Sequence, residues 1–408
     1  MSQSTNVKKL LAIPGPIELS PTVLEALGQP PLSHVSPEFV KIFQESLHLT
    51  RQVVRTSNKA SQPFILAGSG TLGWDQVAAN LIEKGDKVLV LSTGYFGEGF
   101  RDCLHGYGAN VDLIKAPLGG TVNLEDIEQA LNRKKYKAVT ITHVDTSTGV
   151  LSDAKAIAAC VKKISPSTLL ILDAVCSLAS EDIQFDAWGL DIVLSASQKG
   201  LGGPPGLSIL IASARAISTF ESRINSISKK PLQTFPYSYS YSYYTSWSKW
   251  LPIMRAYDQG KPAYFGTPAV TLVKAYHASL VEIMRGEVAL DQRLEMHRGA
   301  SRRVKEAAER LGMVQVASEP AGRANGMTAV YVPQNFAGGA VDVLGAVGKR
   351  GVVMAGGLVS EIKDRYIRIG HMGWSVVGEK GKDVDRIVRV LEDAVREVEA
   401  RSRVSARL

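Results

Sequence analysis

The chain has few cysteines and no long apolar run. Three cysteines among 408 residues are too few for a disulfide framework, which is typical of a protein from a reducing compartment. No stretch approaches the roughly 18 apolar residues that a membrane span needs. Residues 1–9 contain no arginine and no apolar run of signal-peptide length. We therefore expect neither a membrane protein nor a secreted one.

Histidines are also scarce, and charge of one sign does not dominate. The seven histidines show no paired spacing typical of metal ligands, so we expect no metal site. The net charge of +8 is modest for this length, and no basic stripe is interleaved with aromatic residues, which argues against nucleic-acid binding. An excess of positive charge favours anionic ligands instead.

What is present is the composition of an ordinary soluble globular protein, with 45% hydrophobic and 21% charged residues. Its length allows one large domain and a smaller one. Short apolar segments alternate with helical ones, and the expected strands are Phe64–Ala67, Val88–Leu91, Ala138–Thr142, Leu169–Leu172, Asp191–Ser195 and Leu207–Ile211. This pattern predicts an α/β fold with a mostly parallel sheet, covered on both faces, in a large domain over residues 21–285.

The predicted helices of this domain run from Pro21, over residues 37–55 and 74–83, from about residue 97, and over residues 153–164. Before them, residues 1–20 form an extended arm, because Pro14 and Pro16 exclude a regular helix. Residues 231–250 interrupt the pattern. Their Tyr/Ser alternation at residues 237–243 is compatible with a strand, but we favour a variable loop over the active-site region.

The remainder predicts a smaller C-terminal α+β domain over residues 286–408. Residues 277–311 read as helical, residues 329–332 and 366–369 as strands, and residues 383–401 as a closing helix.

Lys199 and Asp173 lie at the carboxyl ends of two expected strands, where α/β sheets bind ligands. This pair is what pyridoxal phosphate requires: the lysine forms a Schiff base with the aldehyde, and the aspartate keeps the pyridine nitrogen protonated. A lysine at a strand end is more commonly a solvated surface residue. Its pairing with Asp173 favours the catalytic interpretation.

Residues 68–73 spell the G-x-G-x-x-G fingerprint of dinucleotide sites before a helix. No acidic residue follows the next strand to bind a ribose, so a dinucleotide is not favoured. Small residues at a helix N-terminus expose N–H groups to an anion, and Ser69, Gly70 and Thr71 are therefore candidate donors to a single phosphate. A plain glycine-rich turn remains the alternative.

Two other strand ends carry candidate residues. Phe96 could stack on a flat heterocycle, although core packing is the commoner role of a lone aromatic side chain. Residues 146–148 offer hydroxyl groups near the carboxyl ends of the strands, where we expect the ligand. Four strand ends thus converge on the parts of one cofactor.

The chain resembles the alanine–glyoxylate aminotransferases, fold-type I pyridoxal-phosphate enzymes of the class V group that also includes serine–pyruvate and serine–glyoxylate aminotransferases. The likeness is strongest to the fungal branch. It extends over nearly the whole chain, in the segments Ile13–Pro16, Ala67–Thr71, Thr146–Gly149, Asp173–Val175, Ser197–Lys199, Tyr264–Pro268 and Ile367–Gly370.

The resemblance implies a mostly parallel sheet of the seven-stranded type in the large domain and a role for each matching residue. Lys199 and Asp173 would be catalytic, and Arg368 would clamp the substrate carboxylate beside Gly15, a task suited to its planar fork. Tyr264 and Thr267 would reach the phosphate of the neighbouring subunit. The other cofactor-binding positions are Ser69, Gly70, Thr71, Phe96, Thr146 and Gln198. Phe96 stands where many relatives have tryptophan, and Thr71 where histidine is common.

The implied reaction converts alanine and glyoxylate to pyruvate and glycine, in a homodimer with shared active sites. Serine–glyoxylate or serine–pyruvate transamination is the alternative, and 2-aminoethylphosphonate transamination is less favoured. A cysteine desulfurase needs a mobile cysteine late in the chain, whereas the last one here is Cys176. A silent binding protein would be expected to have lost Lys199 or Asp173.

The sequence closes on Ala406-Arg407-Leu408, a variant of the Ser-Lys-Leu peroxisomal signal. The frayed end of a basic helix is the alternative explanation. We expect residues 401–405 to be too polar to pack and free for an import receptor. Since glyoxylate chemistry is peroxisomal in many relatives, the peroxisome is favoured over the cytoplasm or the mitochondrion.

Overall fold

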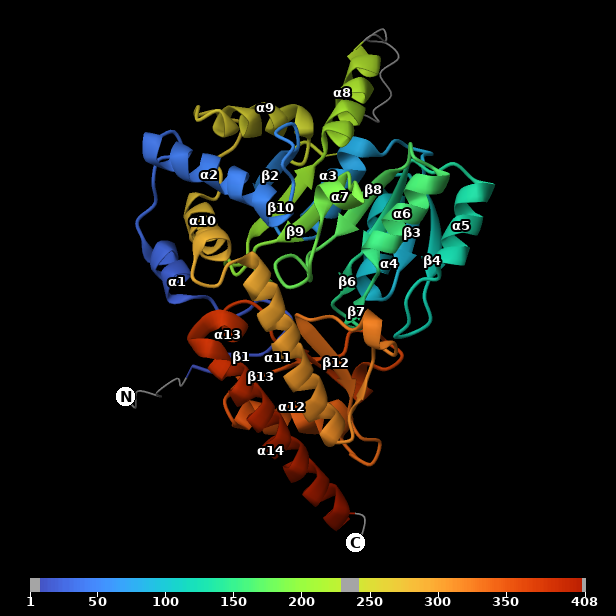
Figure 1. Ribbon diagram of the computed structural model, residues 1–408, viewed down its shortest axis with the longest axis vertical. Helices are drawn as coiled ribbons and strands as arrows, with labels where there is room; N and C mark the ends of the chain where they lie inside the picture. Colours follow the sequence, from blue (N-terminus) through green and yellow to red (C-terminus); the bar gives the residue numbers. More distant parts are fainter. Residues whose placement is uncertain (1–7, 229–241, 406–408) are drawn as a thin grey trace.

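The computed structural model describes residues 8–228 and 242–405. Its main feature is a seven-stranded sheet (Figure 1). In spatial order the strands are β2 (Gln62–Ala67), β10 (Leu207–Ala212), β9 (Ile192–Ala196), β8 (Leu169–Asp173), β5 (Ala138–Thr142), β3 (Lys87–Ser92) and β4 (Asn110–Lys115). Only β10 runs antiparallel to its neighbours in this sheet. The predicted mostly parallel sheet is confirmed.

Helices cover the large sheet on both faces, as the continuous apolar strands predicted (Figure 1). Those that alternate with the strands are α3 (Leu72–Leu81), α4 (Tyr95–Gly106), α5 (Leu124–Arg133), α6 (Ala154–Ile164), α7 (Phe185–Trp188) and α8 (Ala214–Ser228). The helices near β2 are α1 (Pro21–Gly28), α2 (Pro37–Val53), α9 (Trp247–Asp258) and α10 (Val270–Arg285). Proline starts α1 and α2, and the hydroxyls of Ser20 and Ser36 cap them by accepting N–H bonds.

The C-terminal part holds a second, antiparallel sheet of four strands. Their order is β11 (Val314–Gln315), β12 (Met327–Tyr331), β15 (Tyr366–Gly370) and β14 (Ala355–Gly356). Around it lie α11 (Leu290–Arg310), η2 (Pro320–Gly322), α12 (Gly339–Lys349), η3 (Lys363–Arg365), α13 (Trp374–Val377), η4 (Gly378–Gly381) and α14 (Lys382–Ser405). The expected α+β arrangement is present.

The extended N-terminal arm is tied to this smaller sheet region. Its strand β1 (Leu10–Leu11) pairs in parallel with β13 (Val352–Val353). Further on, the N–H of Gly370 at the end of β15 donates to the carbonyl of Ala12 at 2.8 Å. The hairpin β6 (Val144–Asp145) and β7 (Val150–Leu151) completes the strands. The arm therefore reaches the functional region already fixed at one end.

Two predicted segments need correction, and two elements were missed. The helical run expected at residues 277–311 is two helices, because α10 already begins at Val270 and the chain leaves it at Gly286 with extended torsion angles. The segment 231–250 ends in α9, which starts at Trp247, where the buried indole stacks on Phe64 at 4.8 Å. Residues 237–241 lie outside the described residues. Neither β4 nor α5 was predicted, since β4 is an edge strand whose Asp112 interrupts the apolar run.

Buried apolar side chains form one large cluster around the seven-stranded sheet and a second one in the C-terminal part. Helix α11 contributes Leu290 and Leu294 to the first and Ala300 and Val304 to the second. The predicted boundaries at residues 20 and 285 stay predictions. Within the described ranges, no helix is both long enough and apolar enough to cross a membrane.

Candidate active site

Lys199 lies just beyond the carboxyl end of β9, with only 8% of its surface exposed. Its Nζ donates to the carbonyl of Pro14 at 2.7 Å and to Oγ1 of Thr146 at 3.2 Å. The amine is therefore turned away from bulk water. Burial lowers the pKa of the Lys199 amine, because a charged ammonium is poorly solvated there. The site therefore increases the share of the neutral, proton-accepting amine.

Gly15 lets the arm cross directly over Lys199. Its φ of +125° is disfavoured for residues with a side chain, and an added Cβ would lie 3.0 Å from Cγ of Lys199. Glycine is required here by both backbone conformation and space. The candidate Gly15 is therefore part of the Lys199 environment.

Asp173 ends β8, the strand that pairs with β9. Its carboxylate is buried and accepts the indole N–H of Trp74 at 2.7 Å and the N–H of Val175 at 3.0 Å. Burial raises the pKa of Asp173 to about 6, against the opposing effect of these two hydrogen bonds. At neutral pH the group is thus mainly an anion, as a partner for a protonated ring nitrogen must be.

Trp74 was not recognised as a site residue from the sequence. Its ring stacks on Phe100 at 5.4 Å, so the residue has the apolar signature of a core side chain. Only the tertiary structure reveals the bond from its N–H to Asp173.

The glycine-rich turn lies between the ends of β8 and β9. A Cβ on Gly70 would lie 2.7 Å from Cγ2 of Val175 and 3.4 Å from Cβ of Ala196. Ser69 and Thr71 are exposed, share a hydroxyl hydrogen bond of 2.7 Å, and immediately precede α3. Since the first N–H groups of a helix have no intrahelical acceptor, this turn is suited to hold an anion.

Gln198 is next to Lys199 in the chain and carries a buried polar atom. Its Oε1 is buried without a hydrogen-bond partner among the described residues. A buried polar atom of this kind calls for an explanation, and a bound polar group is a common one. A side-chain amide can be turned over so that its oxygen and its NH2 group change places. In that orientation Gln198 presents N–H groups to a phosphate.

Arg368 sits on β15 and faces the same region from the smaller sheet. Its Nε donates to the carbonyl of Gly356 at 2.7 Å, and its Nη1 donates to that of Thr146 at 3.3 Å. No ion pair recorded for the described residues involves Arg368. Burial lowers its pKa, but guanidinium groups start so high that the charge persists. A half-buried cation without a carboxylate partner is therefore available to an anionic ligand.

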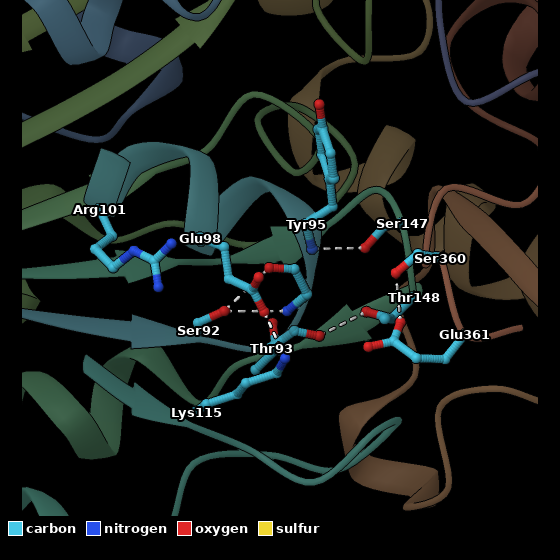
Figure 2. A network of polar contacts seen from close by, with 12 residues as sticks. Ser92, Thr93, Tyr95, Glu98, Arg101, Lys115, Ser147, Thr148, Ser360 and Glu361 are labelled. Atoms are coloured by element: carbon cyan, nitrogen blue, oxygen red, sulfur yellow. Dashed lines mark hydrogen bonds and ion pairs between the residues drawn. The ribbon is translucent and has the colours of Figure 1, made fainter. Parts of the chain in front are cut away.

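Phe96, in the first turn of α4, is half-buried, and its N–H donates to the carboxylate of Asp145 at 3.1 Å. Asp145 was likewise not identified from the sequence. Figure 2 shows the polar contacts that tie the turn before α4 to Ser147 and Thr148.

Tyr264 and Thr267 are not brought to Lys199 within one chain. Tyr264 is 63% exposed and its ring lies 5.2 Å from that of His34, while Thr267 is also exposed. Over the described ranges, no recorded hydrogen bond joins either side chain to Lys199 or Gln198. The single chain thus assembles all the predicted site residues except these two.

The comparisons with known proteins point in one direction. The profile of the aminotransferase class-V family matches residues 24–246. The chain is 45% identical to alanine–glyoxylate aminotransferase 1 of Saccharomyces cerevisiae over 89% of this chain and 91% of that one. It is 25% identical to serine–glyoxylate aminotransferase of Arabidopsis thaliana, over 89% and 85% of the two chains.

Solved structures share the whole architecture. Alanine–glyoxylate aminotransferase from Nostoc sp. superimposes with a TM-score of 0.84 at 27% identity, covering 97% of each chain. The predicted fold class, a large α/β domain with a smaller α+β one, is confirmed.

Proposed function

This chain belongs to the class V aminotransferase family, and we propose that it transfers the amino group of alanine to glyoxylate, with pyridoxal 5′-phosphate as cofactor. The products would be pyruvate and glycine. The observation that carries the proposal is the buried amine of Lys199 beside the strand that ends in Asp173, with the free guanidinium of Arg368 nearby. The 45% identity to the yeast alanine–glyoxylate enzyme supports the choice of substrates.

The site residues fit this cofactor part by part. Pyridoxal phosphate supplies, when bound, an aldehyde that exchanges amino groups and a ring that accepts electrons. The N–H groups of the turn at residues 69–71 and the amide of Gln198 would hold its phosphate. Asp173 would accept a hydrogen bond from the ring nitrogen, Phe96 would lie against the ring, and Lys199 would bind the aldehyde.

Lys199 is then the residue that moves protons. In its neutral form Nζ would take the proton from the α-carbon of alanine and pass it on to the cofactor; in the second half of the reaction it would deliver a proton to the carbon of glyoxylate that receives the amino group. The carbonyl of Pro14 and the hydroxyl of Thr146 accept N–H bonds from this amine and so direct its lone pair. Burial, which lowers the pKa of Lys199, keeps more of it in the reactive form at neutral pH.

Arg368 would bind the carboxylate that alanine and glyoxylate share. Its planar fork can form two parallel hydrogen bonds to that group. The carbonyls of Gly356 and Thr146 already fix the guanidinium from behind. A 2-aminoethylphosphonate donor lacks a carboxylate, and so this substrate is less favoured.

A panel of amino donors tests the proposal. Purified protein with pyridoxal phosphate and glyoxylate should form glycine with the highest kcat/KM from alanine. Serine is the second candidate, supported by the similarity to the plant serine–glyoxylate enzyme. A higher kcat/KM with serine or 2-aminoethylphosphonate would replace the alanine assignment, and no glycine from any donor would refute the transaminase proposal.

We also propose a homodimer with two shared active sites. Tyr264 and Thr267 lie in one turn, with Thr267 between Gly266 and Pro268, on the surface of the single chain, where a two-fold partner could receive them. Their hydroxyls would then complete the partner's phosphate site.

For the cellular location, we propose the peroxisome, with Ala406-Arg407-Leu408 read by the import receptor. These three residues lie outside the described ranges. Helix α14 continues to Ser405, with the i,i+4 pairs Arg401–Glu397 and Arg403–Glu399, and the side chains of Arg401 and Arg403 are exposed.

A fluorescent protein fused to the N-terminus tests this location. It should give peroxisomal puncta that disappear when residues 406–408 are deleted. Diffuse or mitochondrial fluorescence from the intact chain would contradict the proposal.

A further inference from the structure

Two turns at the edge of the large sheet are joined by hydrogen bonds. One, residues 92–97, leads from β3 into α4 and carries Phe96; the other, residues 145–148, follows β5. The hydroxyl of Thr148 donates to the carbonyl of Thr93 at 3.1 Å, and the N–H of Tyr95 donates to the hydroxyl of Ser147 at 3.0 Å (Figure 2). The first turn of α4 is therefore held by a segment some fifty residues away in sequence.

Asp145 is the centre of this connection and is fully buried. Its Oδ2 accepts the N–H groups of Phe96 at 3.1 Å and Gly97 at 3.2 Å. Its Oδ1 accepts the N–H of Ser147 at 2.9 Å and the Ser147 hydroxyl at 2.6 Å. Helix α4 has no capping side chain of its own, because Gly94 occupies the N-cap position. Asp145 thus caps a helix from another strand.

Gly94 shows how tightly this contact is built. An added Cβ would lie 2.8 Å from both Cγ and Oδ1 of Asp145 and would also overlap the hydroxyl of Ser147. The carboxylate takes the space that a side chain at position 94 would need. The glycine therefore serves the close approach of Asp145 rather than an unusual backbone conformation.

The residue after Asp145 contacts the reactive groups. Thr146 accepts a hydrogen bond from Nζ of Lys199 through its hydroxyl and one from Arg368 through its carbonyl. The hydroxyl of Tyr366 donates to the carbonyl of Ser147 at 2.8 Å. One short turn consequently connects the backbone of Phe96, the amine of Lys199 and the guanidinium of Arg368.

We propose that Asp145 is a positioning residue of the active site, whose carboxylate sets the position of the Phe96 ring relative to Thr146 and Lys199. This inference rests on the proposed pyridoxal-phosphate function. An ordinary helix cap would only stabilise the fold, whereas a positioning residue also determines how the cofactor is held. Four donors point at this carboxylate, and an amide, with one oxygen and two N–H groups, cannot accept from all of them.

The matched comparison is Asp145→Asn with Asp153→Asn. Asp153 also caps a helix, since its Oδ1 accepts the N–H of Ala156 at 2.9 Å, but it makes no contact with Lys199, Phe96 or Thr146 among its recorded hydrogen bonds. In each variant, three quantities are measured: hydrogen exchange of the amides of residues 95–97, the dissociation constant of pyridoxal phosphate, and the visible circular dichroism of the bound cofactor.

Asp145→Asn should speed exchange at Phe96 and Gly97 and weaken cofactor binding, each about tenfold or more, and should change the visible dichroism. Asp153→Asn should leave all three at their wild-type values. Wild-type affinity and dichroism in Asp145→Asn would overturn the proposal even if the variant is less stable. If Asp145→Asn does not fold, Ser147→Ala, which removes one donor to Asp145 and the acceptor for Tyr95, should cause smaller changes in the same directions; no change would overturn it.

A double-mutant cycle with Phe96→Ala tests the route of the effect. If Asp145 acts through the Phe96 ring, the two changes in cofactor affinity should be strongly non-additive. Full additivity would contradict the proposal. Hydrogen exchange needs no substrate, so an incorrect donor assignment leaves this test unaffected, whereas wild-type protein that binds no pyridoxal phosphate would refute the proposed function itself.

Discussion

Replacing Lys199 by alanine should abolish transamination while the protein still folds. The variant loses the amine that we propose moves the proton of the substrate α-carbon, and general acid–base catalysis alone contributes roughly 10²- to 10⁴-fold. We expect kcat to fall by at least that factor. The fold should persist because the amine donates only to the carbonyl of Pro14 and the hydroxyl of Thr146, which water can satisfy.

Lys305→Ala is the matched control. Lys305 is half-buried and also donates to a backbone carbonyl, that of Ala324, at 2.7 Å, but it lies on α11 and, among the described residues, has no recorded bond to the site residues. Its removal should leave kcat near the wild-type value. The measurement is glycine formation at saturating alanine and glyoxylate, with circular dichroism to check folding. Normal turnover in a folded Lys199→Ala protein would refute the assignment.

The double variant Tyr264→Phe/Thr267→Ala should lose most of its affinity for pyridoxal phosphate. Each hydroxyl would bind a charged phosphate, and each such hydrogen bond contributes about 1.5–3 kcal/mol. The dissociation constant should therefore rise by roughly 10²- to 10⁴-fold. We expect this large effect although Tyr264 is 63% exposed in the single chain and, among the described residues, has no recorded hydrogen bond to Lys199. Equilibrium titration with the cofactor measures it.

Mixing this double variant with Lys199→Ala tests whether the site is shared. In a heterodimer, one site combines an intact Lys199 with an intact loop, so an equal mixture should recover about a quarter of the wild-type sites. A protein that carries all three changes, mixed with Lys199→Ala, should recover nothing, because every site then lacks the lysine. Unchanged cofactor affinity of Tyr264→Phe/Thr267→Ala would show that the loop does not reach a phosphate.

The sequence predicted the strands of the large sheet well where they are buried on both faces. Strand β5 is continuous apolar sequence and matches its expected bounds of Ala138–Thr142. Edge strand β4 was missed because one polar residue, Asp112, breaks its run. Lys199 and Asp173 could be paired in advance, since the carboxyl ends of neighbouring parallel strands meet at one edge.

Residues that act through tertiary contacts could not be found in this way. Trp74 and Asp145 each bind a partner across the fold, and nothing in the local pattern distinguishes them from a core aromatic residue and a turn aspartate. Arg368 and Gly15 came only from the family resemblance. The structure supplies their physical reason: one is an unpaired cation on β15, the other a glycine pressed against Lys199.

The most direct measurement of the central claim is the identity of the lysine that holds the cofactor. Pyridoxal phosphate bound to the wild-type protein is fixed to that lysine by borohydride, and the labelled peptide is identified by mass spectrometry. The account predicts one label per chain, on Lys199, and no label in folded Lys199→Ala protein. A label on another lysine, or none on the wild-type chain, would contradict it.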